Sequence, residues 1–96
     1  KSLAIIIPSY NEDKTICTVI ENINKHLESF EKIDKFDIIV IDDGSVDETG
    51  QKVKNLNNVI LLTHEFNRGI GAAVRTGLQF VENNKSVYIT VYKLYF

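Results

Sequence analysis

Short apolar runs alternate along this chain with longer stretches in which apolar residues recur every three or four positions. Four of the runs have the length of strands, and three of the stretches between them have the period of an amphipathic helix. The strands are predicted at Leu3–Ile7, Phe36–Ile41, Val59–Leu62 and Val87–Val91. Because strands and helices alternate with short connections, we expect an α/β fold with a mainly parallel sheet flanked by helices.

The helices are predicted from the residues that cap them and from their apolar faces. Asn11 or Asp13 is expected to cap the first helix, and Ser45 with Glu48 fits a capping box at the start of a shorter second helix. The third helix is expected to run from about Ile70 to Glu82. The side chains expected to face inward are, in chain order, Ile16, Val19, Ile20, Ile23, Leu27 and Phe30, then Val53 and Leu56, then Ile70, Val74, Leu78 and Val81.

Proline and asparagine mark two of the predicted ends. Pro8 is expected to end the first strand, because proline has no N–H to donate to a central ladder. Asn57 and Asn58 are expected to break the second helix. The connections that follow the first three strands then lie at one edge of the sheet, where open α/β sheets bind their ligands.

Composition and charge indicate a small globular chain and exclude several classes of protein. The 96 residues are 44% hydrophobic and 25% charged, which is typical of one domain or of part of a larger one. A net charge of −2 provides no basic surface for nucleic acid or for an anionic membrane. The single cysteine cannot form an internal disulfide, and no apolar run approaches the roughly 18 residues that cross a bilayer. A cytoplasmic protein is therefore expected.

The first two connections carry an aromatic ring and two carboxylates. Tyr10 can stack on a base, and an ionised Asp42 or Asp43 can accept hydrogen bonds from a base N–H or a ribose hydroxyl. Taken alone, Asp42-Asp43-Gly44 is equally consistent with a turn, since aspartate and glycine are common turn residues.

The third connection is rich in small residues and contains cations. Gly69 and Gly71 permit close approach of the backbone to a ligand, and Arg68 or Arg75 can pair with phosphate. The two glycines lack the third glycine of a dinucleotide-binding motif. His64 stands just before this connection, and we interpret it as a structural residue.

Three segments stand in order along the chain: residues 5–12 read IIIPSYNE, residues 40–49 read VIDDGSVDET, and residues 67–78 read NRGIGAAVRTGL. Together they resemble the N-terminal half of a family 2 glycosyltransferase. The third segment is most similar to the polyprenyl-phosphate branch, the dolichyl-phosphate mannose and glucose synthases. The resemblance implies a GT-A fold, a nucleotide-binding α/β sheet. It also implies an inverting enzyme that moves a sugar from a nucleotide donor to an acceptor, usually with Mg²⁺ or Mn²⁺.

Carried over to this chain, the resemblance implies a binding site for a UDP- or GDP-sugar, with polyprenyl phosphate as an expected acceptor. Both aspartates are expected near the nucleotide, with Asp42 deeper in. The implied site residues are Pro8, Tyr10 and Glu12 at the border of the nucleotide, Asp42 or Asp43 at the base or ribose, and Gly69, Gly71 and Arg75 lining the pocket.

The resemblance also implies an Asp-x-Asp motif after the fourth strand, where it holds the metal on the donor diphosphate. Tyr92-Lys93-Leu94 stands at that place, and tyrosine and leucine supply no carboxylate ligand. We therefore expect no metal ligand and no catalytic residue here. Residues 1–96 are interpreted as a single domain, the nucleotide-sugar-binding part of a glycosyltransferase, truncated and catalytically incomplete.

Two other interpretations compete with this one. A non-catalytic nucleotide-binding or protein-interaction module can use the same fold, and the apolar, aromatic residues 88–96 favour self-association through an exposed strand. A receiver domain also uses paired aspartates, but after its first strand, where this chain has Pro8-Ser9-Tyr10. Contact with the cytoplasmic face of a membrane is expected only through a lipid acceptor or a missing segment.

Overall fold

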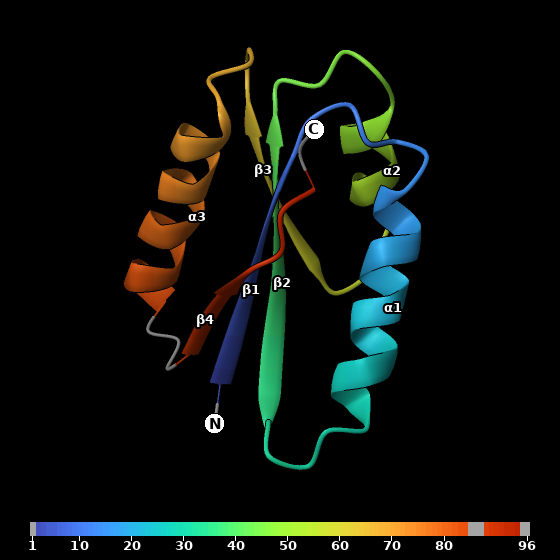
Figure 1. Cartoon of the computed structure of the whole chain (residues 1–96), viewed down its shortest axis with the longest axis vertical. Helices are drawn as coiled ribbons and strands as arrows, with labels where there is room; N and C mark the ends of the chain where they lie inside the picture. The colour runs from blue at the N-terminus through green and yellow to red at the C-terminus, as the bar shows by residue number, and fades with distance from the viewer. Residues whose placement is uncertain (1, 85–87, 95–96) are drawn as a thin grey trace.

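Four parallel strands form one sheet in the computed structural model, which describes residues 2–84 and 88–94 (Figure 1). The strands are β1 (Ser2–Ser9), β2 (Lys35–Asp43), β3 (Val59–His64) and β4 (Tyr88–Val91). They lie in the order β3-β2-β1-β4, so the direction of the chain through the sheet reverses beside β1. Ligands of open α/β sheets bind at such a switch point, outside the carboxyl ends of the strands.

The helices cover the two faces of the sheet. Helices α1 (Ile16–Glu28) and α2 (Thr49–Lys54) lie on one face, and α3 (Ile70–Asn84) lies on the other (Figure 1). The predicted α/β fold and the order of its elements are confirmed. Val87, predicted to begin the fourth strand, lies outside the described residues, as do the aromatic residues at 95 and 96.

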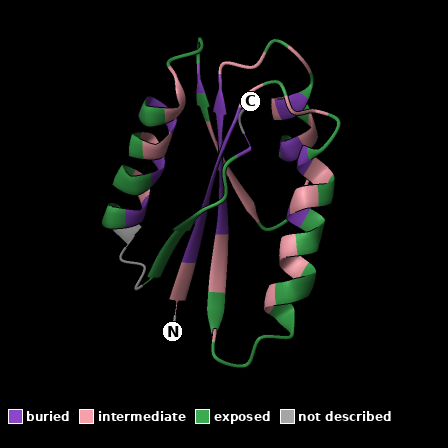
Figure 2. Ribbon diagram, viewed as in Figure 1, coloured by how far each residue is buried: buried purple, intermediate pink, exposed green. Residues whose placement is uncertain are grey.

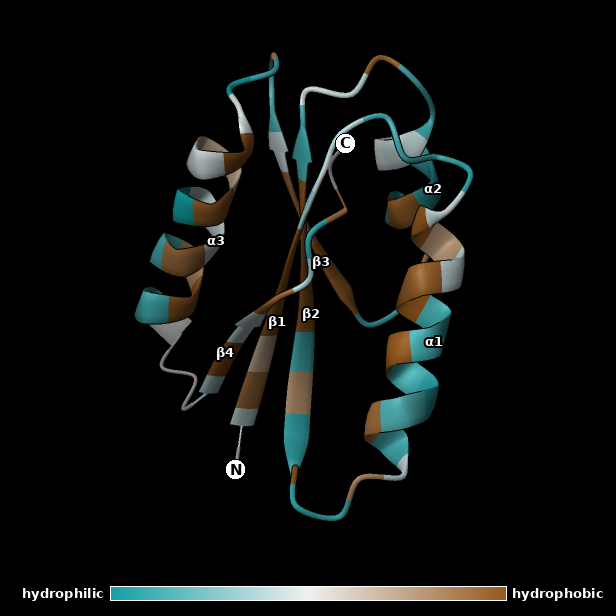
Figure 3. Ribbon diagram, viewed as in Figure 1, coloured by the Kyte–Doolittle hydropathy of each residue, from teal (hydrophilic) through white to brown (hydrophobic). Residues whose placement is uncertain are grey.

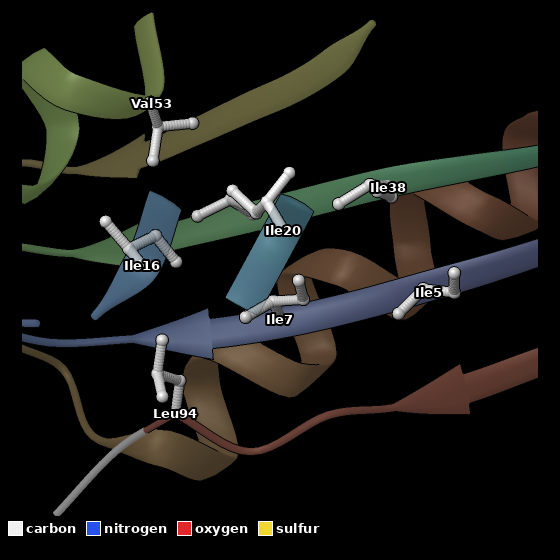
Figure 4. Close-up of a cluster of buried hydrophobic side chains, with 8 residues drawn as sticks. Ile5, Ile7, Ile16, Ile20, Ile38, Val53 and Leu94 are labelled. Atoms are coloured by element: carbon white, nitrogen blue, oxygen red, sulfur yellow. The ribbon is translucent and has the colours of Figure 1, made fainter. Parts of the chain in front are cut away.

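Strands β1 and β2 are buried on both faces, which explains their unbroken apolar runs. Alternate side chains of each strand enter two separate cores, because successive residues of a strand point to opposite faces. Figure 4 shows the core under α1 and α2, formed by Ile5, Ile7, Ile38, Val40, Ile16, Ile20, Val53 and Leu94. The core under α3 is formed by Ala4, Ile6, Ile39, Ile41, Ala73 and Val81.

The prediction that Pro8 ends the first strand is wrong. Pro8 pairs with Ile41 inside the ladder between β1 and β2, and β1 continues to Ser9. The N–H and C=O of one residue point to the same side of a strand. The Pro8 carbonyl accepts a hydrogen bond from the N–H of Leu94, at 3.2 Å, so the missing N–H of Pro8 also faces that side. The ladder with β4 has already ended at Val91, and the ladder with β2 loses no donor.

The predicted starts of the first two helices are also wrong, whereas the third helix begins at Ile70 as predicted. Helix α1 begins at Ile16 with Thr15 as its N-cap, and α2 begins at Thr49 with Glu48 as its N-cap. Asn11 and Ser45 bond instead to each other's connecting segments, described below. Helix α1 ends at Glu28, so Phe30 lies beyond it with half of its surface exposed, rather than on the apolar face.

The buried stripe of α3 consists of small residues. Leu78 was expected to face inward, yet it is 39% exposed, whereas Ala73, Gly77 and Val81 are buried. A Cβ atom at position 77 would stand 2.6 Å from Cγ2 of Ile6. The helix therefore approaches the sheet more closely than a stripe of large side chains would allow.

We expect Gly77→Ala to lower the free energy of unfolding by about 1 kcal/mol. Overpacking a core costs roughly 1–3 kcal/mol, and about 1 kcal/mol of that is offset by the higher helix propensity of alanine. Gly71→Ala is the matched control, because its Cβ would meet only Nη1 of Arg75, at 3.7 Å. Urea unfolding followed by circular dichroism measures both variants. Equal effects of the two substitutions would contradict the close contact at Gly77.

Strand β4 is the exposed edge of the sheet. Figure 2 shows its residues as exposed, whereas most of the neighbouring strand β1 is buried. Figure 3 shows that apolar residues occur within this exposed strand. Tyr88, Ile89, Val91 and the adjacent Tyr92 are each 44–46% exposed. Within the described residues, no helix combines the length and the apolar character needed to span a bilayer.

Candidate functional site

The connections after β1, β2 and β3 gather at the carboxyl edge of the sheet, at the top of Figure 1. The fold therefore brings together the three segments that the sequence singled out. Gly44, in the left-handed region at φ 74°, lets the connection after β2 pack directly on the connection after β3. A Cβ at this position would collide with the backbone of Phe66 and Asn67.

The two adjacent aspartates at the end of β2 point to opposite faces of the sheet. Asp43 continues the row of Ile39 and Ile41 and faces α3, whereas Asp42 continues the row of Ile38 and Val40 and faces α2. The strand geometry therefore gives the two carboxylates different surroundings. Asp43 is fully buried and Asp42 is 5% exposed, so Asp42 is not the deeper of the two.

Asp43 holds the connection after β3. Its Oδ1 accepts the backbone N–H of Arg68 at 3.0 Å, and its Oδ2 accepts the backbone N–H of Gly69 at 2.8 Å. The ring Nδ1 of His64 lies 2.7 Å from Oδ1, and the Asn67 side-chain amide donates to Oδ2 at 3.4 Å. A carboxylate offers about four acceptor positions, and this one uses them on the protein itself.

Asp42 has fewer partners in the structure. Its Oδ1 accepts the backbone N–H of Ser45 at 3.1 Å. Its Oδ2 lies beside the first turn of α2, where a Cβ at Gly50 would stand only 2.6 Å from it. The carboxylate of Asp42 is thus held in place at the loop edge by one backbone donor and by close packing against a glycine.

A reciprocal set of hydrogen bonds, here called the clasp, joins the connections after β1 and β2. Asn11 donates its backbone N–H to Oγ of Ser45, and its side-chain oxygen accepts the N–H of Val46, both at 2.9 Å. Asp13 bonds in the same pattern: its backbone N–H donates to Oδ2 of Asp47 at 3.2 Å, and its own Oδ2 accepts the N–H of Glu48 at 3.3 Å. The left-handed backbone of Asn11, at φ 54°, turns the chain into this arrangement.

Sequence reasoning missed the clasp because its residues also fit helix caps. Asparagine, serine, threonine and aspartate bond to nearby backbone groups in turns as well as at helix ends. Thr49, fully buried, accepts the N–H of Glu12 at 2.9 Å and donates to Asp47 at 2.5 Å. The density of such residues at 9–15 and 43–49 was the signal available, but it does not specify the pairing.

The surroundings of Asp47 in the clasp shift the pKa of its carboxyl. Burial raises the pKa of this carboxyl. Hydrogen bonds from Thr49 and Asp13 lower the pKa by a larger amount, so the net pKa is below its usual value. The folded chain thus favours ionised Asp47 more than the unfolded chain does. This contribution to stability is present above the ordinary pKa of 3.8 and is lost as the pH falls through the lowered value.

Asp47→Asn is accordingly expected to flatten the acid side of the stability curve. At neutral pH the variant is less stable than the parent, and the gap narrows as the pH falls below about 4. Free energies of unfolding measured in urea between neutral pH and about pH 2.5 test this. A gap that stays constant over the whole range would mean that the Asp47 charge contributes nothing.

The remaining predicted site residues of the first connection lie at the same edge of the sheet. Pro8 is buried within β1, and Tyr10 and Glu12 are half-buried in the segment that follows it. Glu12 also organises the start of α1. Its carbonyl accepts the N–H of Ile16 at 2.9 Å, and its side chain accepts the hydroxyl of Thr15 at 3.0 Å.

The glycine segment leads into α3. Gly69 has φ 97°, a backbone conformation that favours glycine, and its carbonyl accepts the N–H of Ala73 at 3.1 Å. Gly71 lies in the first turn beside the guanidinium of Arg75, and Arg68 and Arg75 are both exposed. Two cations therefore flank the start of a long helix, where an anion is favoured by exposed N–H groups and by the helix dipole.

The described residues do not fit a divalent-metal site. Within 2–84 and 88–94, no group of three or more His, Cys, Asp or Glu side chains could hold a metal ion. Tyr92 and Lys93 are exposed after β4, and Leu94 is buried in the core under α1. None of these three side chains offers the carboxylate oxygens that Mg²⁺ or Mn²⁺ prefers.

Comparisons with known proteins show which family this chain resembles. The family described as glycosyl transferase family 2 matches residues 4–92. A UDP-N-acetylglucosamine–dolichyl-phosphate N-acetylglucosaminyltransferase from Methanococcus voltae is 36% identical, over 82% of this chain and 35% of that protein. A human dolichyl-phosphate β-glucosyltransferase is 33% identical, over 81% of this chain and 27% of that protein.

A solved structure shows the same fold. Residues 1–349 of S. aureus TarS superpose with a TM-score of 0.76 at 26% identity, over 97% of this chain and 27% of that chain. The present chain thus spans between about a quarter and a third of the length of the proteins it resembles.

Proposed function

The chain belongs to glycosyl transferase family 2, and on that basis we propose that its carboxyl sheet edge binds the nucleotide of a sugar donor. The fold is of the GT-A type. We further propose that these residues form the donor half of an enzyme that transfers a sugar to polyprenyl phosphate. Pro8, Tyr10 and Glu12 would border the nucleotide, and Gly69, Gly71 and Arg75 would line the glycine side of the pocket.

The observation that carries this proposal is the different environment of the two aspartates. The carboxylate of Asp43 already accepts hydrogen bonds from His64 and from the backbone N–H groups of Arg68 and Gly69. Asp42 has one backbone donor and stands at the edge where the three connections meet. We therefore propose Asp42 as the carboxylate that accepts a hydrogen bond from the base or ribose, and Asp43 as the residue that shapes the loop.

The names of the relatives support a choice of donor and acceptor. The Methanococcus voltae protein is named for a UDP-sugar donor, and both relatives are named for dolichyl phosphate. We propose UDP as the preferred nucleotide of this chain and a polyprenyl phosphate as the acceptor of the enzyme to which it corresponds. Contact with a membrane would then arise through the lipid acceptor.

Binding of the nucleotide to this chain is proposed to be independent of metal, because the described residues offer no carboxylate cluster for a divalent ion. The donor site would instead use the exposed guanidinium groups of Arg68 and Arg75 beside the diphosphate. We derive no step that passes through a metal.

Calorimetric titration with UDP and with GDP, each with and without Mn²⁺, tests the proposal. We expect UDP to bind more tightly than GDP and the affinity to be the same with and without Mn²⁺. Absence of binding to both nucleotides would contradict the proposal and would favour the competing non-catalytic interaction module. A requirement for Mn²⁺ would contradict only the metal-independent part.

We also propose that this 96-residue chain self-associates through β4. Each residue of this edge strand is exposed, and apolar side chains lie on both of its faces. An apolar cavity of about 410 Å³ adjoins the strand, lined by Leu3, Ile5, Val19, Ile23 and Leu27, with Val91 and Tyr92 on the β4 side. An uncovered apolar edge is a template for pairing with a second copy.

Thr90→Lys is expected to shift the proposed self-associated chain to a monomer, because an edge lysine opposes strand pairing. The matched control is Thr63→Lys, the same change at an exposed threonine on β3, the opposite edge of the sheet. Sedimentation velocity measures the mass of each. If the parent chain is already monomeric, or if both lysines act alike, association through β4 is wrong.

A further inference from the structure

We propose that His64 is a positioning residue for the nucleotide site: its Nδ1–H fixes the Asp43 carboxylate, and that carboxylate in turn fixes the backbone of Arg68 and Gly69. The inference rests on the proposed function only in assigning this loop to a nucleotide. The hydrogen-bond chain itself is a property of the fold.

The sheet register places the two side chains together. His64 is the last residue of β3, and Asp43, the last residue of β2, is its direct partner in the parallel ladder. Paired residues of neighbouring strands point to the same face, here the face covered by α3. His64 is 8% exposed and Asp43 is fully buried, so their contact is protected from water.

The protonation of the His64 ring follows from the groups around Asp43. The Asp43 carboxylate accepts two backbone N–H groups, which favours its ionised, acceptor-only form. His64 Nδ1 lies 2.7 Å from Asp43 Oδ1, a distance that a lone pair facing an anion would not tolerate. We therefore assign the ring proton to Nδ1, so that the ring donates to Asp43.

The other ring nitrogen is held by α3. Nε2 of His64 lies 2.8 Å from Oγ1 of Thr76, and Oγ1 of Thr76 lies 3.1 Å from the carbonyl oxygen of Ala72. Threonine has one hydroxyl proton. If that proton goes to Nε2, the ring nitrogen accepts it through its lone pair; if it goes to the Ala72 carbonyl, Nε2 must itself carry a proton and donate to Oγ1. In both arrangements Thr76 sets the plane of the imidazole, and Nδ1 stays directed at Asp43.

The chain of contacts thus links α3 to the loop that leads into it. Thr76 orients His64, His64 orients Asp43, and Asp43 holds the N–H groups of Arg68 and Gly69. Loss of the His64 contact would remove one of the four donors that hold the Asp43 carboxylate, and the loop that Asp43 holds would then open more often. The backbone of Arg68 would then no longer be held in one position, and its side chain, which we place beside the diphosphate, would be less well positioned.

The first test uses the unaltered chain and needs no nucleotide. Nitrogen-15 NMR of the imidazole reports which ring nitrogen carries a proton at neutral pH. The proposal requires a protonated Nδ1 with a hydrogen-bonded proton that exchanges slowly. An unprotonated Nδ1 would overturn it.

The second test uses two substitutions of His64, one that keeps a donor near Asp43 and one that keeps a polar group near Thr76. The amide of asparagine in His64→Asn reaches roughly the position of Nδ1, and that of glutamine in His64→Gln reaches roughly the position of Nε2. Amide hydrogen exchange of Arg68 and Gly69 is expected to stay near the parent rate in His64→Asn and to rise at least tenfold in His64→Gln. Equal exchange rates in the two variants would refute the positioning role.

Nucleotide titration of the same variants separates the two proposals. We expect His64→Asn to bind UDP within about threefold of the parent and His64→Gln to bind at least tenfold more weakly. If the parent binds no nucleotide, the proposed function fails, while the exchange rates still decide the role of His64. If UDP binds equally to both variants although their loops differ, the loop does not set the affinity and His64 has no positioning role at this site.

Discussion

Replacing Asp43 with alanine is expected to lower the free energy of unfolding by about 2 to 4 kcal/mol. The substitution removes the acceptor of the part-buried backbone N–H groups of Arg68 and Gly69, and a donor left unsatisfied away from water costs roughly 1–3 kcal/mol. It also leaves the ring N–H of His64 without its Asp43 acceptor. For a small domain whose total stability is typically about 5–15 kcal/mol, this is a large fraction.

Urea unfolding at a fixed protein concentration measures the effect. The matched control is Asp37→Ala, a change of the same kind at the half-buried beginning of β2, for which we expect a loss of about 1 kcal/mol or less. Asp43→Asn provides a second comparison, because it keeps the shape but turns an amide donor toward other donors. If Asp43→Ala lowered the free energy of unfolding no more than Asp37→Ala does, the hydrogen bonds around Asp43 would not contribute measurably to stability.

The fold was predictable from sequence where burial leaves a periodic pattern. Strands β1 and β2 are buried on both faces, so their apolar runs stand out against any alternative, and the helices between them follow from their spacing. The helix ends were not predictable in the same way. Ser45 and Glu48 satisfy a local capping rule, but tertiary bonds to the connection after β1 satisfy Ser45 better.

The small residues of α3 show a second limit. A helix read from sequence assigns its large apolar residues to the core, which placed Leu78 inside. The structure buries Gly77 instead, because close approach of α3 to Ile6 and Ile41 excludes anything larger on that stripe. Packing distance between two elements is a property of both partners, and one periodic pattern does not contain it.

The candidate site was predictable in its residue types and only partly in their arrangement. Strand alternation alone implies that Asp42 and Asp43 face opposite sides of the sheet, so the sequence already indicates different surroundings for the two carboxylates. The link from Asp43 through His64 to Thr76 joins β2, β3 and α3. Sequence distance gives no signal for such contacts, because they depend on the register between strands.

Asp42→Asn is expected to weaken nucleotide binding by roughly ten- to a hundredfold while the chain remains folded. A hydrogen bond to a charged group contributes about 1.5–3 kcal/mol, and each 1.4 kcal/mol corresponds to a factor of ten in affinity. The asparagine oxygen can still accept the N–H of Ser45, which Asp42 now binds at 3.1 Å. The expected loss of stability is therefore smaller than for Asp43→Ala.

The comparison that decides this prediction is Asp47→Asn, the same change in the same connection but within the clasp rather than at the proposed nucleotide contact. Calorimetric titration with UDP should separate the two variants, with Asp47→Asn close to the parent affinity. Equal losses would mean that the charge of the loop as a whole attracts the nucleotide. Unchanged binding in Asp42→Asn would remove Asp42 from the site. Asp43 would then have to be the carboxylate that contacts the nucleotide. The four donors around Asp43 leave it little capacity to accept a hydrogen bond from a ligand.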